Sequence, residues 1–235
     1  MCFSASASLT AGVLLTFVGT ETIKKVHKPQ QIVFAVIPVF FALQQFTEGV
    51  LWLSMTRAGF AGVEAAASYF FVIMAQIIWP VMIPLSVLLL EENKTRKRIL
   101  YALLAVGAAI CFYNLYSLVL HGIHAVISGR HIAYQSNVPD TLDKKALFFY
   151  LAVTVVPLFV SGIKRVPILG VLMVLSFAIS AVFYMQCLTS VWCFFAAVMS
   201  FVVFYIVRDA HSQFHFDRIG KNYGVRQTRA AARIV

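Results

Sequence analysis

The chain has 235 residues, of which 61% are hydrophobic and only 12% are charged. A soluble domain carries about 25% charged residues, and a globule of this size cannot bury so large an apolar excess, so the composition excludes an ordinary soluble protein and indicates a lipid bilayer as its surroundings. The net charge of +10 comes from short basic clusters between apolar runs, which indicates membrane topology and argues against nucleic acid as a partner.

Apolar runs long enough to cross the ~30 Å hydrocarbon core of a bilayer follow one another along the chain. We expect them to be helices, because lipid offers no water to satisfy backbone polar groups. The seven predicted transmembrane helices are Ser4–Ile23, Gln31–Leu53, Ala65–Leu90, Ile99–Leu120, Ala146–Ile163, Ile168–Gln186 and Thr189–Val207. The predicted fold is therefore an all-α integral membrane bundle over residues 1–207, with a basic tail over residues 208–235.

The distribution of basic residues predicts the orientation of this bundle. Fifteen Lys and Arg residues lie in the first, third and fifth loops and in the C-terminal tail, whereas four lie on the other side. Loops rich in Lys and Arg remain in the cytoplasm. We therefore expect the tail in the cytoplasm and the N-terminus outside.

A polar stripe lies in the outer half of the second predicted helix. Gln44, Gln45, Glu48 and Trp52 are at helical spacing and share one face. Glu48 is expected about 7–8 Å below the membrane surface, where a carboxylate that faced lipid would be costly. The stripe should face the bundle interior, either as a hydrogen-bond network between helices or as the polar anchor of a ligand site.

Polar side chains from other segments are predicted to reach the same outer half. The fourth predicted helix carries a stripe at spacings of three and four residues, the loop after it holds a histidine and a tyrosine, and further residues come from the tip of the first helix and from the last two helices. These residues are Cys2, Asn114, Ser117, His121, His124, His131, Tyr134, Ser176, Ser180, Tyr184, Cys187, Thr189, Ser190, Trp192 and Cys193.

Thiol chemistry is one use of this convergence. A disulfide from Cys2 to Cys187 or to Cys193 would suit an oxidising exterior. Alternatively, a histidine such as His131 could activate Cys2 or Cys193 as a nucleophile. The three residues Cys2, Cys193 and His131 are thus the catalytic candidates.

A metal site is the other use. His121 and His124 are three residues apart, and His131 follows in the outer loop. Together with a thiolate or Glu48 they could bind zinc or copper, because imidazole and thiolate suit these ions. Histidines at this spacing also commonly meet water or lipid headgroups, so the pattern leaves the alternatives open, and the sequence identifies no cofactor.

Five short motifs resemble a known family: Met1-Cys2-Phe3-Ser4-Ala5, Gln44-Gln45-Phe46-Thr47-Glu48-Gly49, Trp79-Pro80, His131-Ile132-Ala133-Tyr134 and Ser190-Val191-Trp192-Cys193-Phe194-Phe195-Ala196-Ala197. Together they look like an uncharacterised family of small bacterial multi-pass membrane proteins that open with Met-Cys-Phe-Ser-Ala. The resemblance runs from residue 1 to about Ser200, implies a bacterial inner membrane and supplies no activity. It favours Cys2, Glu48, His131, Trp192 and Cys193 as site residues over His121 and His124, which lie outside these motifs.

Three functions are compatible with these patterns. The first is binding or transport of a small ligand in an outward-facing pocket, the second is a thiol- or metal-dependent membrane enzyme or redox protein, and the third is a structural or assembly subunit. The sequence does not name the ligand. The residues predicted to bind it are Gln44, Gln45, Glu48, Trp52, Trp79, Asn114, Tyr134, Tyr184 and Trp192.

Overall fold

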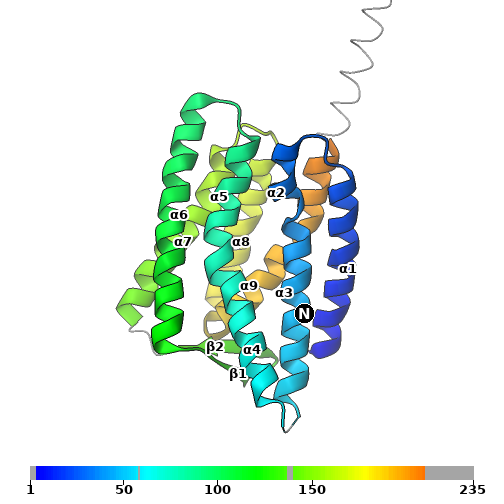
Figure 1. The fold of residues 1–235 in the computed structure, drawn as a ribbon, viewed down its shortest axis with the longest axis vertical. Coiled ribbons are helices and arrows are strands. Elements are labelled where there is room, and N and C mark those ends of the chain that lie inside the picture. Colours follow the sequence, from blue (N-terminus) through cyan, green and yellow to red (C-terminus); the bar gives the residue numbers. More distant parts are fainter. Residues whose placement is uncertain (1–3, 58, 137–139, 210–235) are drawn as a thin grey trace, which may run out of the picture.

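The computed structural model describes residues 4–57, 59–136 and 140–209. In this part of the chain, six helices are long and apolar enough to cross a membrane, and one further apolar helix is shorter. The six are Ala5–Lys24, Pro29–Met55, Ala61–Leu90, Lys94–His121, Val166–Phe183 and Met185–Asp209, and the shorter one is Lys145–Val160. The helices run side by side along the long axis of the molecule (Figure 1), so the predicted helical bundle is confirmed. Six of the seven predicted spans are matched by helices long and apolar enough to cross a membrane, and the fifth, predicted over Ala146–Ile163, is matched by the shorter helix.

The individual elements follow in chain order. The first half contains α1 (Ala5–Lys24), η1 (Pro29–Gln31), α2 (Ile32–Ala35), α3 (Ile37–Met55), α4 (Ala61–Val72), the π-helix η2 (Ile73–Ile78), α5 (Trp79–Leu90) and α6 (Lys94–His121). The second half contains β1 (His124–Ser128), β2 (His131–Gln135), α7 (Asp140–Val160), α8 (Val166–Phe183), η3 (Met185–Cys187) and α9 (Leu188–Val198).

A β-hairpin corrects the all-α prediction, which treated this segment as an outer loop. Strands β1 and β2 pair antiparallel, and Ser128 lies opposite His131 across a two-residue turn. The turn begins with Gly129, whose φ of +62° is the left-handed value that a tight hairpin turn requires and that glycine adopts readily. The hairpin closes over one end of the bundle (Figure 1), which we call the hairpin end.

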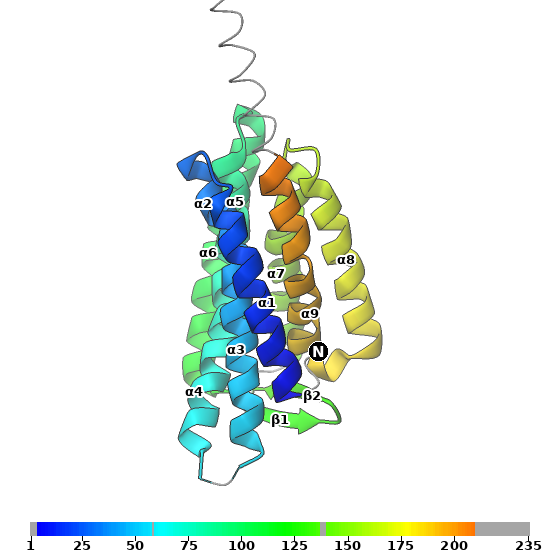
Figure 2. The ribbon, with the colours of Figure 1, turned by 90° about the vertical axis from the view of Figure 1, so that its right-hand side faces the viewer.

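Helices α1 and α3 pack closely through small residues. A Cβ on Gly12 would lie 2.9 Å from the ring of Phe46, and one on Gly19 would lie 2.6 Å from Val39. Small residues allow helix backbones to approach each other inside a membrane, where dispersion contacts drive association. This packing holds α3, with its polar face, against the side of the bundle formed by α1 (Figure 2).

The end opposite the hairpin carries the basic clusters. The last residues of α1, the start of α6 and the loop before α8 lie there, as does the end of the last helix (Figures 1 and 2). These segments contain Lys24, Lys94, Arg165 and Arg208. Basic residues therefore gather at one end, as the orientation prediction requires. Of the predicted tail over residues 208–235, the structure describes only Arg208 and Asp209.

A buried carboxylate ties two loops together at this end. Glu91, which is 7% exposed, accepts hydrogen bonds from the backbone N–H groups of Glu92 at 3.1 Å, Asn93 at 3.0 Å and Gly162 at 2.6 Å. Its Oε2 lies 3.8 Å from Arg96 Nη1. Burial raises the pKa of Glu91, but the three N–H donors and the nearby guanidinium outweigh it and hold the pKa below its ordinary value of 4.5.

Candidate functional site

A chain of buried polar side chains joins α3 to α9 inside the bundle. Gln44 Nε2 donates a hydrogen bond to Cys193 Sγ at 3.1 Å, and Trp79 Nε1 donates to Gln44 Oε1 at 3.3 Å. One turn further along α3, the carboxylate of Glu48 accepts a hydrogen bond from the hydroxyl of Ser190. Gln44 and Glu48 are fully buried. The polar stripe of α3 therefore faces the bundle interior and meets the first turns of α9, as the sequence predicted.

Two residues of the same predicted stripe have different surroundings. Gln45 is fully buried, and neither its amide nitrogen nor its amide oxygen has a hydrogen-bond partner in the described part of the chain. Trp52 packs with Leu51, Ala67 and Ile132 in a cluster at the hairpin end. The stripe thus reaches from the hydrogen-bonded centre of the bundle to a separate apolar cluster under the hairpin.

The π-helix η2 presents two backbone carbonyls to side chains of neighbouring helices. Pro80 follows it and has no N–H, so the carbonyls four and five residues earlier lack the donor that residue 80 would supply in an α- or a π-helix. Asn114 Nδ2 donates to the carbonyl of Gln76 at 2.7 Å, and the Tyr150 hydroxyl donates to the carbonyl of Ala75 at 2.6 Å. Side chains of α6 and α7 therefore supply the hydrogen-bond donors that these two carbonyls of η2 lack.

Three adjoining cavities lie between the hairpin end and the interior of the bundle, and two of them border the π-helix η2. The outer cavity, of about 390 Å³, lies among α6, the hairpin, α7 and η3, and its lining includes Asn114, Ser117, Tyr134, Cys187 and Thr189. The middle cavity, of about 70 Å³, shares Asn114 and Thr189 with it. The inner cavity, of about 40 Å³, shares Tyr150, Trp192 and Cys193 with the middle one. The three spaces form a series that leads from the hairpin end into the bundle.

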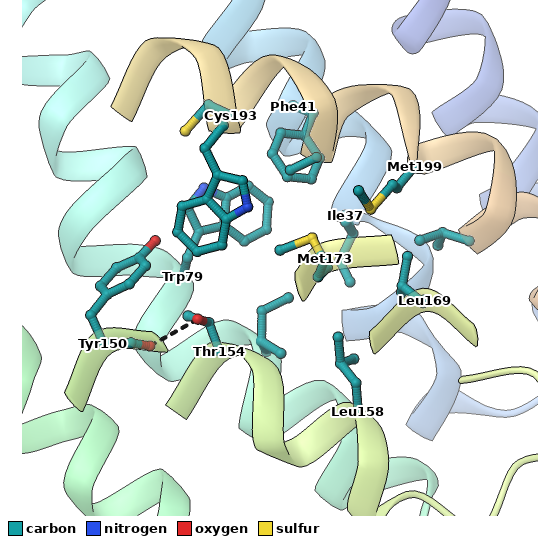
Figure 3. Close-up of a pocket in the computed structure, with 14 residues that line it drawn as sticks. Ile37, Phe41, Trp79, Tyr150, Thr154, Leu158, Leu169, Met173, Cys193 and Met199 are labelled. Atoms are coloured by element: carbon teal, nitrogen blue, oxygen red, sulfur yellow. Dashed lines mark hydrogen bonds between the residues drawn. The ribbon is translucent and has the colours of Figure 1, made fainter. Parts of the chain in front are cut away.

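The inner cavity is lined mainly by apolar side chains. Figure 3 shows Trp79, Tyr150 and Cys193 on one side of this space, facing Met173 and Leu169. Apolar side chains from α3, α5, α7, α8 and the last helix complete the wall. The transfer of an apolar group from water into such a cavity is favourable.

The hairpin supplies aromatic contacts at the outer end of the site. Tyr134 lines the outer cavity and stacks on Phe71 with ring centroids 4.6 Å apart. His131 meets the ring of Tyr184 edge-on, with centroids 4.8 Å apart, and burial lowers the pKa of His131 below its ordinary value. Tyr134 thus joins the predicted pocket directly, whereas Tyr184 supports the hairpin beside it.

The histidines predicted as metal ligands lie in different settings. His121 Nδ1 is 3.1 Å from the carbonyl oxygen of Ser117 within α6, His124 is exposed at the start of β1, and His131 packs on Tyr184. Within residues 4–57, 59–136 and 140–209, no group of three or more His, Cys, Asp or Glu side chains is arranged to hold a metal ion.

The cysteines bear on the two thiol hypotheses. Cys111, Cys187 and Cys193 are free thiols with respect to the described residues. Cys2 lies outside the described residues, so its disulfide to Cys187 or Cys193 stays a prediction. The hydrogen-bond partner of Cys193 is the amide of Gln44, and an amide is not a base that could remove the thiol proton. The catalytic use of Cys193 with His131 remains a prediction.

Two contributors to the site were not predicted from the sequence. Gln76 and Tyr150 line the middle cavity beside Asn114. A glutamine four residues before a proline in an apolar span could have indicated the irregular turn. Tyr150 carried no such signal, because its neighbours in the sequence are apolar and its partner carbonyl lies 75 residues away in the chain.

Comparison with known proteins gives a match to one family. It is described as a family of unknown function (DUF6629), and it matches residues 1–217. The match agrees with the expected uncharacterised family and extends further than the expected limit near Ser200. No curated protein and no solved structure matches the chain.

Proposed function

We propose that this chain, which belongs to the DUF6629 family of unknown function, binds a small uncharged ligand in its outer cavity. The chain has six apolar helices of membrane-spanning length, which suggests a multi-pass membrane protein. We further propose that it lies in a bacterial inner membrane with the hairpin end outside. The gathering of basic residues at the opposite end supports that orientation.

The chemistry of the outer cavity carries the proposal. Its described lining offers neutral hydrogen-bonding groups, among them Asn114, Ser117 and Thr189, and contains no Lys, Arg, His, Asp or Glu. A charged ligand would lose its hydration there without a counter-charge from the described lining. The volume of about 390 Å³ falls in the range of natural ligand pockets, roughly 300–1,000 Å³. An uncharged polar molecule is therefore the best match.

The rim of the outer cavity supports access from the hairpin end. Ser136, Met185 and Gln186 line the cavity and are exposed. They follow the hairpin and α8, so a ligand could enter beside the hairpin without crossing the bundle. We therefore propose entry from the outer side of the membrane.

The buried Glu48 has a different proposed part from the direct ligand anchor that the sequence suggested. Glu48 is not among the residues that line the three cavities. Its carboxylate binds the hydroxyl of Ser190, which lies two residues before Trp192 and three before Cys193 on α9. We propose that Glu48 positions α9 and, through it, the walls of the middle and inner cavities.

A cavity-filling variant tests the proposal. Ser117→Trp would place a large side chain in the outer cavity, and Val119→Trp is the matched control, because Val119 is 76% exposed on the same helix. The wild-type protein in nanodiscs would be screened by thermal unfolding against uncharged polyols, amides and nucleosides, and against charged analogues of each. We expect uncharged compounds to raise the unfolding temperature of the wild type and the control variant.

Ser117→Trp should remove that rise while the protein without added compound unfolds at a temperature close to that of Val119→Trp. Equal stabilisation of both variants would contradict binding in the outer cavity. A preference for the charged analogues would contradict the uncharged ligand class.

A further inference from the structure

We infer that the ligand is amphipathic, with its polar head in the outer cavity, a hydrogen-bond acceptor at Trp192 Nε1 and an apolar chain in the inner cavity. This inference rests on the proposed function, because it extends the same binding site. The chemical class is an uncharged ester, amide or ether that links a polar head to a short hydrocarbon chain.

Continuity of the three cavities is the first observation that carries the inference. The outer and middle cavities share Gln76, Asn114 and Thr189. The middle and inner cavities share Tyr150, Trp192 and Cys193. A single elongated molecule that enters at the hairpin end would therefore pass Trp192 before it reaches the inner cavity.

Polarity changes along this path. Neutral polar side chains make up about half of the described lining of the outer cavity. The inner cavity has few polar side chains, and all of these except Trp192 are hydrogen-bonded within the protein. The Thr154 hydroxyl donates to the Tyr150 carbonyl at 2.8 Å, and the Tyr150 hydroxyl donates to Ala75. Trp79 and Cys193 are both hydrogen-bonded to Gln44. A hydrogen-bond acceptor in the inner cavity would therefore find no uncommitted O–H or N–H donor among these residues, only the weak S–H of Cys193.

Trp192 is the exception in that lining. Its side chain is 6% exposed, and its indole N–H has no hydrogen-bond partner in the described part of the chain. The rings of Tyr150 and Phe177 pack edge-on against it, with centroid distances of 5.8 Å and 5.3 Å. A buried donor without an acceptor is unfavourable, so a ligand oxygen at the junction of the middle and inner cavities would supply what the protein lacks.

The volumes limit the length of the apolar chain. A cavity needs about 10–15 Å³ of space open to a water-sized sphere for each water-sized group that it holds. The acceptor at Trp192 lies where the middle and inner cavities meet, so the apolar chain beyond it has only the inner cavity. That cavity, of about 40 Å³, accommodates about three or four carbons. Longer chains would have to remain in the outer cavity or in the lipid.

A homologous series of 1-monoacylglycerols with acyl chains of two to twelve carbons, together with free glycerol, tests the inference. Binding to the protein in nanodiscs would be measured by equilibrium dialysis and referred to the free aqueous concentration, with empty nanodiscs subtracted. We expect the affinity to rise about fourfold for each added CH₂ up to about four carbons and then to level off.

Two variants separate the acceptor from the chain. Trp192→Phe keeps an aromatic ring and removes the N–H, and it should weaken binding of the series about fivefold. Trp52→Phe is the matched control, because its N–H is also buried without a described partner but it lines none of the three cavities. Ala196→Leu, which adds bulk to the inner cavity, should shorten the optimal chain and leave glycerol binding unchanged.

The outcomes distinguish the inference from the proposed function. Affinity that is independent of chain length, yet abolished by Ser117→Trp, would overturn the amphipathic ligand and leave the outer binding site intact. The same result from Trp192→Phe and Trp52→Phe would overturn the assignment of the acceptor. If neither this series nor any uncharged compound bound the wild type, both proposals would fail.

Discussion

Replacing Tyr150 with phenylalanine should lower the free energy of unfolding by about 1–3 kcal/mol, the loss for a buried carbonyl that is left without a donor. The Tyr150 hydroxyl donates to the Ala75 carbonyl at 2.6 Å, and Ala75 is 2% exposed. Pro80 cannot replace that donor, because it has no N–H. The ring itself is kept, so packing against Trp192 should change little and the loss should report the hydrogen bond.

Unfolding in mixed micelles with rising SDS, followed by circular dichroism, would measure this change. Tyr116→Phe is the control, because Tyr116 is 65% exposed on α6, and it should stay within about 0.5 kcal/mol of the wild type. A Tyr150→Phe variant as stable as Tyr116→Phe would refute the argument that the π-helix depends on side-chain donors. Asn114→Ala should destabilise the same turn, and the double variant would measure the coupling between the two donors.

Three further predictions concern packing, pH and topology. Gly107→Ala should destabilise the protein by about 1–3 kcal/mol in the same assay, since its Cβ would lie 2.1 Å from the Pro80 carbonyl oxygen, whereas Gly62→Ala, with open space around it, should not. Because folding lowers the pKa of Glu91, its contribution to stability should be complete above the ordinary carboxyl pKa and should disappear as the pH falls through the lower pKa of the folded state. Glu91→Gln should be less stable than the wild type near pH 7, and it should lack this loss of stability at acid pH. In intact cells, a membrane-impermeant maleimide should label Arg130→Cys, whereas it should label Lys94→Cys only after the cells are permeabilised. The reverse pattern would contradict the proposed orientation.

Local hydropathy predicted the six helices of membrane-spanning length, and it predicted a seventh span where the apolar helix Lys145–Val160 is shorter. A run of about 20 apolar residues is long enough to cross lipid, and its backbone must bond internally there, so both position and type of each span can be read from consecutive residues. The burial of Glu48 followed from the same reasoning, because a carboxylate in such a run has to face other helices. Its contact with the last helix was expected only as a convergence and became specific through the bond to Ser190.

Only the tertiary structure decided where the cavities lie and which polar groups complete them. The sequence pattern did not distinguish Trp52, which packs under the hairpin, from Trp192, which borders two of the cavities. The link from Tyr150 to Ala75 was equally hidden. Hydropathy and periodicity describe how each segment meets its solvent, whereas a cavity is the space left when several segments pack together. That space depends on the side chains of all of them at once, and no single segment encodes it.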